Sequence, residues 1–162
     1  MPICGIYQVK NAEIAIEAAQ CLLGNKPEHE EMWRDAVAKI QWQGRMEECA
    51  DHFIIDGAHN PGAIEAFVES VRALKEEEPP ILIFSAVSDK KYEQMIEYLC
   101  RHLQTKAFVV TEIEDKRRVP AGELGEIFKR YATCPGYVKA DVKDAISCAY
   151  EMRTKETYIY LS

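Results

Sequence analysis

The chain has 162 residues, with 27 acidic and 20 basic side chains and a formal net charge of −7, so binding of nucleic acid through an overall positive surface is not expected. Hydrophobic residues make up 48% of the sequence and charged residues 29%, which is typical of a globular protein and excludes a disordered or collagen-like chain. No apolar run approaches the roughly 18 residues that span a bilayer, and the opening sequence lacks a secretory signal, so we expect a cytoplasmic protein without membrane contact.

The amino-terminal third of the sequence predicts two helices followed by two short strands. A helix capped by Asn11 and ending at Gly24 is alanine-rich and apolar on nearly all sides, which predicts a buried helix. A more polar segment, residues 27–40, predicts a second and shorter helix. Residues 41–57 predict two short strands, of which the second runs over residues 52–55.

From Asn60 onward, helices and strands alternate. Asn60 is suited to cap a helix whose first residue is Pro61, and the apolar side chains that follow are spaced three and four residues apart. Residues 81–87 are apolar without alternation, as in a strand covered on both faces. The pattern continues with a helix at 92–103, a strand at 106–111, a helix at 124–131, a short strand at 135–138, a helix capped by Asp141 and a strand within 157–161. We therefore predict one domain over residues 1–162, an open, mostly parallel, Rossmann-like α/β sheet of about six strands with helices on both faces.

The segment most suited to ligand binding is the turn after the strand at 52–55. Ligands of open α/β sheets bind beyond the carboxyl ends of the strands, and this turn, residues 56–62, is dense in polar groups. Asp56 is placed to accept hydrogen bonds from a ribose diol, and the start of the next helix offers free N–H groups. A second interpretation stays open, in which Asp56 and Asn60 only cap the turn and the helix.

Two more side chains near this turn have both a chemical and a structural interpretation. An imidazole can transfer protons near neutral pH, which makes His59 a candidate catalyst, but a single histidine in a turn also serves as a hydrogen-bonded structural residue. Arg45 follows Gly44 just ahead of the strand pair. Its guanidinium either grips a terminal phosphate in two places or lies solvated at the surface.

Four stretches of the sequence together resemble the C-terminal domain of folylpolyglutamate synthase, a member of the Mur ligase superfamily that is often bifunctional with dihydrofolate synthase. They are GIYQVKNAEIAIEA, WQGRME, IIDGAHNPGAIEAF and IFSAVSDKKYEQMI, and DGAHNP is the most specific part. The resemblance implies the fold of a Mur ligase C-terminal domain. It also implies ATP-dependent amide synthesis, in which a folate or dihydropteroate carboxylate is phosphorylated to an acyl phosphate that the amino group of L-glutamate attacks.

The resemblance also assigns roles to single residues. Asn11 matches an asparagine that contacts the nucleotide, Arg45 an arginine on the ATP phosphates, and Asp56 an aspartate that holds the ribose. His59 matches a histidine at the cleft, which either orients glutamate, touches ATP or supports the turn. Lys90 in the Asp-Lys pair is either a cleft cation or an ordinary lysine at a helix start.

The sequence departs from the family in two places and lacks part of its machinery. Tyr7 stands where the family more often has histidine, and TYIYLS ends where the family continues into a Gly-Ser-Leu-Tyr turn. The sequence has no GxxxxGK[ST] loop and no convincing magnesium carboxylates, which family members carry in a larger upstream P-loop domain. We therefore expect the isolated chain to be inactive and the domain to close over ATP and Mg²⁺ held by that upstream domain.

Two other functions remain open at this point. A Mur peptidoglycan ligase shares the chemistry but adds amino acids to a UDP-linked substrate, and a regulatory module would bind a nucleotide without catalysis. The basic cluster at 116–118 is assigned no partner, because the rest of the chain is acidic. Six evenly spread cysteines without a CxxC pair predict free thiols, as in a reducing compartment: Cys4, Cys21, Cys49, Cys100, Cys134 and Cys148.

Overall fold

A mostly parallel sheet forms the centre of the computed structural model, which describes residues 5–24, 26–40 and 42–162. Within these residues the sheet has six strands in the order β1-β2-β6-β3-β4-β5. The first pair is antiparallel and every other pair is parallel. This confirms the predicted fold class, with strands β1 (Glu47–Ala50), β2 (Phe53–Ile55), β3 (Ile81–Phe84), β4 (Ala107–Val110), β5 (Gly136–Val138) and β6 (Ile159–Leu161).

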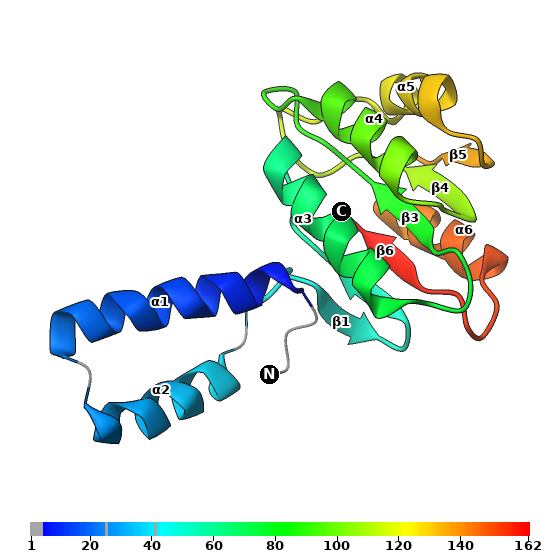
Figure 1. Ribbon diagram of the computed structural model, residues 1–162. Helices are drawn as coiled ribbons and strands as arrows, with labels where there is room; N and C mark the ends of the chain where they lie inside the picture. The colour runs from blue at the N-terminus through cyan, green and yellow to red at the C-terminus, as the bar shows by residue number, and fades with distance from the viewer. Residues whose placement is uncertain (1–4, 25, 41) are drawn as a thin grey trace.

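Helices cover both faces of this sheet, as predicted (Figure 1). One face carries α3 (Pro61–Leu74), α4 (Tyr92–His102) and α5 (Ala121–Tyr131), and the other carries α6 (Val142–Met152). Successive residues of β3 alternate between the two layers, because side chains of a strand point to opposite faces. Leu82 and Phe84 pack under α3 to α5, whereas Ile81 and Ile83 pack under α6. The unbroken apolar run at this strand is thereby explained, although the strand ends at Phe84 rather than at residue 87.

The predicted helix caps at the carboxyl edge of the sheet are present. The Asn60 side chain accepts a hydrogen bond from the Ala63 N–H at 3.0 Å, and Pro61 is the first residue of α3. Asp141 caps α6 in the same way, accepting from the N–H groups of residues 143 and 144. These caps fix where the loops at this edge turn into helices, and so fix the frame of the candidate site.

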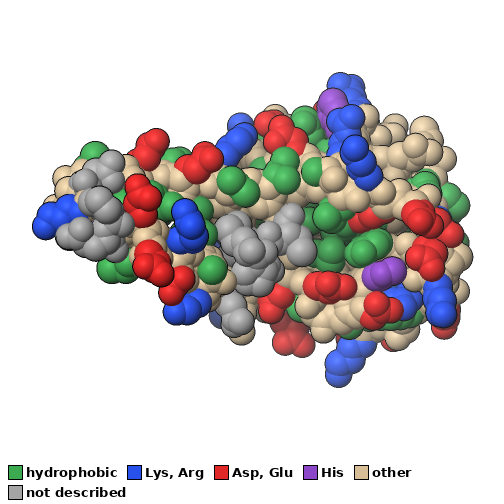
Figure 2. Space-filling view, turned by 60° about the horizontal axis from the view of Figure 1, so that its bottom comes forward, with side chains coloured by type: hydrophobic (Ala, Val, Ile, Leu, Met, Phe, Trp, Pro, Cys, Tyr) green, Lys and Arg blue, Asp and Glu red, His purple; other side chains and the backbone are tan. Residues whose placement is uncertain are grey.

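A two-helix arm extends away from the sheet (Figure 1), formed by α1 (Tyr7–Leu23) and α2 (Pro27–Lys39). The prediction that the first helix is buried and capped by Asn11 is wrong. The helix begins at Tyr7, and Ile14 and Leu22 are 65% and 84% exposed. Its sequence is apolar enough for a buried helix, but no layer within the described residues covers it. Figure 2 shows the arm reaching out to the left, with charged and hydrophobic side chains along it.

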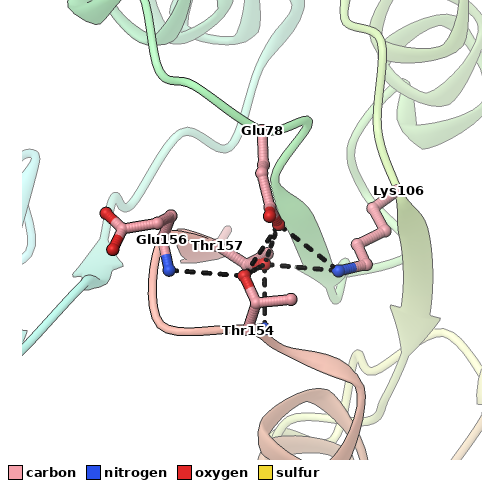
Figure 3. A network of polar contacts seen from close by, with 5 residues as sticks. All are labelled: Glu78, Lys106, Thr154, Glu156 and Thr157. Atoms are coloured by element: carbon pink, nitrogen blue, oxygen red, sulfur yellow. Dashed lines mark hydrogen bonds and ion pairs between the residues drawn. The ribbon is translucent and has the colours of Figure 1, made fainter.

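A polar network joins three strands at the opposite, amino edge of the sheet (Figure 3). Glu78 Oε2 accepts from the hydroxyls of Thr157 at 2.6 Å and Thr154 at 2.8 Å, and Lys106 Nζ lies 3.4 Å away. The hydrogen bonds from the two threonines hold the pKa of Glu78 below its ordinary value. Because these residues precede β3, β4 and β6, the network ties together the starts of the three central strands.

Two further expectations concern the whole chain. In the part of the chain that the structure describes, no helix is long and apolar enough to span a bilayer. Cys4 lies outside the described residues. The other cysteines are free thiols: Cys21, Cys49, Cys100, Cys134 and Cys148.

Candidate functional site

A cavity of about 350 Å³ opens at the carboxyl end of β2. Its wall comes from the first turns of α1, the segment before β1, the residue after β2 and one side of α3. The residues that line it are Tyr7, Gln8, Asn11, Trp42, Arg45, Asp56, Ala63 and Ala66. The structure thus brings together three of the four predicted site residues, Asn11, Arg45 and Asp56, although the role of each stays a prediction.

Asp56 is the most enclosed polar group of this cavity, with 2% of its surface exposed. Its Oδ2 accepts hydrogen bonds from the Tyr7 hydroxyl at 2.6 Å and from the Met46 N–H at 3.0 Å. Burial raises the pKa of this carboxyl, and the hydrogen bonds from Tyr7, Met46 and the Ala58 N–H, with the charge of Arg45, offset only part of that effect. Asp56 therefore holds the start of α1 and the segment before β1 in place, in addition to any contact with a ligand.

Tyr7 was missed as a site residue by sequence reasoning. Burial and its hydrogen bond to Asp56 raise the pKa of the Tyr7 hydroxyl, so that this group is a permanent donor to the carboxyl. The main-chain N–H of the preceding residue, Ile6, donates to the Ser70 hydroxyl in α3 at 3.2 Å. The departure from the family at Tyr7 was the one signal in the sequence, but spacing alone does not pair residues 49 positions apart.

Backbone hydrogen bonding positions Arg45 next to the turn that follows β2. Gly44 has a φ of 65°, a conformation that favours glycine, and its carbonyl accepts from the Gly57 N–H at 2.7 Å. Arg45 Nη1 in turn donates to the Gly57 carbonyl at 3.0 Å. Since a guanidinium has five N–H donors and this contact uses one, the side chain is positioned and still has donors for an anion.

Asn11 lies one helical turn after Tyr7 rather than at a helix cap. Its Nδ2 donates to Oε1 of Gln8 at 3.0 Å, and Gln8 is buried. The helix therefore fixes the Asn11 amide at the rim of the cavity, with its carbonyl oxygen outside that hydrogen bond.

His59 lies apart from the other three predicted residues. It is exposed and does not line the cavity, and its Nδ1 lies 2.9 Å from the Gly57 carbonyl. Because a carbonyl can only accept, Nδ1 is the donor in this contact. This geometry fits the interpretation in which His59 supports the turn, while its catalytic role stays a prediction.

Lys90 and the basic cluster lie on two loops that are joined to each other. The Ser88 N–H donates to the Arg117 carbonyl at 2.7 Å, and the Arg117 guanidinium pairs with Asp89 and Asp115. Lys90 itself is half-buried and does not line the cavity. Arg117 is thus engaged with carboxylates of these two loops.

Within residues 5–24, 26–40 and 42–162, no cluster of three or more His, Cys, Asp or Glu side chains could hold a metal ion.

Comparison with known proteins identifies the protein family to which the chain belongs. The family model for the Mur ligase glutamate ligase domain matches residues 44–162. The chain therefore belongs to the Mur ligase family.

Curated relatives of the chain have names that are more specific than that of the family. The chain is 33% identical over 101 residues to dihydrofolate synthase/folylpolyglutamate synthase of Bacillus subtilis, and 30% identical over 109 residues to folylpolyglutamate synthase of Lacticaseibacillus casei. These matches cover 60% and 65% of the chain but only 24% and 25% of the relatives. The chain thus matches about a quarter of each relative's length.

Solved structures of the same kind share the fold. Mycobacterium tuberculosis folylpolyglutamate synthase complexed with ADP matches 99% of the chain with a TM-score of 0.86 and 21% identity, over 38% of its own length. Escherichia coli FolC in complex with DHPP and ADP matches 93% with a TM-score of 0.80 and 22% identity, over 35% of its length. The chain therefore has the fold of one part of these larger proteins.

Proposed function

We propose that this chain is the C-terminal part of a cytoplasmic, ATP-dependent ligase that joins L-glutamate to a folate and, in a bifunctional enzyme, also to dihydropteroate. One observation supports this most strongly: Asn11, Arg45 and Asp56 line one cavity. They come from a helix, a loop and a strand end, and their combined chemistry suits a nucleotide. The names of the relatives, which are folate enzymes, direct the choice toward folate rather than a UDP-linked peptidoglycan precursor.

Each of the three residues suits one part of ATP. The Asn11 carbonyl oxygen can accept from the amino group of adenine, and the Asp56 carboxyl can accept from the ribose hydroxyls. The Arg45 fork can bind phosphate oxygens and offset the charge that develops when the terminal phosphoryl group moves. A folate carboxylate oxygen attacks this phosphorus and ADP leaves. The glutamate amine then attacks the acyl carbon, loses a proton and expels inorganic phosphate.

The remaining machinery belongs, in this proposal, to an upstream P-loop domain that binds the ATP phosphates and Mg²⁺. The exposed apolar residues of the arm support the existence of such a partner domain. Ile14, Leu22, Leu23 and Met32 are all at least half exposed on α1 and α2, a density of apolar surface that marks an interaction site. The matched family domain starts at residue 44, after the arm. We propose that the arm packs on the upstream domain, and that residues 1–162 act as one C-terminal unit.

Closure of the two parts then completes the site. The start of the arm is held by the Tyr7 hydrogen bond to Asp56, the residue after β2, and by the Ile6 hydrogen bond to Ser70 in α3. A domain attached to the arm would therefore lie next to the cavity. Closing it would bring Arg45 to the phosphates and exclude water from the acyl phosphate, which hydrolysis would otherwise consume.

A chimeric enzyme tests this function. The chain would replace the matching C-terminal part of the Bacillus subtilis relative, and ATP-dependent transfer of radiolabelled glutamate to tetrahydrofolate and to dihydropteroate would be measured. We expect transfer by the chimera and none by the isolated chain. Transfer to a UDP-muramoyl substrate instead would refute the folate assignment. ADP binding without any transfer would favour the regulatory alternative.

A further inference from the structure

The chain has two tryptophans in contrasting environments. Trp33 in α2 is 7% exposed, and its ring lies 5.4 Å from that of His29. Trp42 is 65% exposed and lines the cavity with Asn11, Arg45 and Asp56. Because Trp42 is exposed and lines this cavity, the face of its indole ring is available to pack against a planar ligand bound there.

The cavity combines polar side chains with two aromatic ones, Tyr7 and Trp42. Tyr7 is half-buried and its hydroxyl is bound to Asp56, whereas Trp42 is the more exposed of the two. On the α3 side the cavity is lined by Ala63 and Ala66, whose side chains are small and apolar. Trp42 comes from the same short segment as Arg45, which the hydrogen bond between Gly44 and Gly57 folds against the turn. A planar apolar group held near Trp42 would thus share the cavity with an amide, a carboxyl and a guanidinium.

Of the components of the proposed reaction, a purine nucleotide fits this set best. Its phosphates suit Arg45, its ribose diol suits Asp56, and its base has both a polar edge and an aromatic face. L-Glutamate has no aromatic group. The pterin ring of a folate is planar, but it does not carry the diol or diphosphate that the neighbouring Asp56 and Arg45 would bind.

We infer that Trp42 stacks on the purine base of the bound nucleotide while Asn11 contacts the edge of that base. This inference rests on the proposed function and adds a specificity determinant to it. Any base can stack on an aromatic side chain through its flat face, and this stacking contributes enough to change affinity by roughly tenfold or more. Binding should therefore depend on the base and not only on the phosphates.

Fluorescence and calorimetry test this inference in the chimeric enzyme. With the tryptophans of the Bacillus part and Trp33 replaced by phenylalanine, emission reports Trp42 alone. We expect ADP to quench that emission and pyrophosphate to leave it nearly unchanged. Trp42→Ala should weaken ADP binding roughly tenfold without changing pyrophosphate binding, while Trp42→Phe should retain most of the ADP affinity. Because Trp42 is largely exposed, the folded state should tolerate both changes, which circular dichroism would verify.

The outcomes separate this inference from the function on which it rests. If ADP binds and Arg45→Ala weakens its binding, but Trp42 emission and the Trp42→Ala affinity do not change, the stacking is refuted and the ligase function stands. Quenching by dihydropteroate but not by ADP would also refute it, in favour of the pterin. If ADP does not bind to the chimera at all, both the function and the stacking fail.

Discussion

The hydrogen bond between Tyr7 and Asp56 joins the start of the arm to the residue that follows β2, and removing it is the most informative single perturbation. Tyr7→Phe keeps the ring and deletes only the hydroxyl that donates to Asp56 Oδ2 at 2.6 Å. Hydrogen bonds to a charged partner contribute about 1.5–3 kcal/mol, and neutral ones about 1 kcal/mol. Because Met46 also donates to the same oxygen, the carboxyl is not left without a partner. We therefore expect a loss of about 1–2 kcal/mol in the free energy of unfolding.

The assay is urea unfolding of the 162-residue chain, followed by far-UV circular dichroism. Tyr137→Phe is the matched control, because Tyr137 is an exposed residue of β5, and its loss of a hydroxyl should change stability by less than about 0.5 kcal/mol. A double-mutant cycle with Asp56→Ala should give a coupling energy of about 1 kcal/mol or more. An effect of Tyr7→Phe no larger than that of Tyr137→Phe, or a coupling near zero, would refute this reasoning.

Three further predictions concern pH, packing and the polar network. Burial raises the pKa of Asp56 above its unfolded value of 3.8, so its contribution to stability is fully present below that pH and is lost as pH rises through the raised folded pKa. The stability of the natural chain relative to Asp56→Asn should therefore fall as the pH rises above 3.8, and a rise would contradict the assigned shift. Gly136→Ala would push a methyl group into the ring of Phe108, which stacks on Phe128, so urea unfolding should show a loss of about 1–3 kcal/mol. In the control Gly122→Ala the methyl enters open space at the start of α5 and should be neutral or stabilising, and equal effects of the two would argue against the tight packing. Thr157→Val removes hydroxyl contacts to Glu78 and Lys106 and should lower Tm by roughly 2–8 °C, whereas exposed Thr133→Val should leave it unchanged; calorimetry that finds the two alike would contradict a stabilising network.

Much of the fold could be predicted because local signals and burial agree in the sheet. Residues 81–84 are apolar throughout, and the strand is indeed buried on both faces. Asn60 and Pro61 fix the start of α3 by hydrogen bonding and by a preset φ angle, which depend only on neighbouring residues. Such features need no knowledge of distant parts of the chain.

The arm could not be predicted in the same way. Its first helix has the composition of a buried helix, yet Leu22 is among the most exposed apolar side chains. An apolar composition indicates that a helix has surface suited to burial. It does not indicate which other part of a protein, if any, packs against that surface. The true start at Tyr7 also depends on a long-range contact, since the hydroxyl binds Asp56 across 49 positions.

The candidate site was predictable in part. Topology predicts Asp56 at the carboxyl edge of the sheet, and the family resemblance assigns Arg45 to the phosphates of the same nucleotide; the structure places both residues at one cavity. The position of His59 outside that cavity was not predictable, because a turn residue's orientation depends on φ and ψ angles that its sequence neighbours leave open. The positions of Tyr7 and Trp42 at the cavity could not be predicted, because they depend on how the loop before β1 lies relative to α1 and α3.

The most direct test of the central claim is calorimetric titration of the chimeric enzyme and its variants with ADP and with pyrophosphate. If Arg45 binds phosphate and Asp56 binds ribose of one nucleotide, Arg45→Ala should weaken both ligands by roughly tenfold or more, because it removes charge-assisted hydrogen bonds. Asp56→Asn should weaken ADP alone. Unchanged ADP affinity in both variants, with the fold intact, would show that these residues do not share a nucleotide.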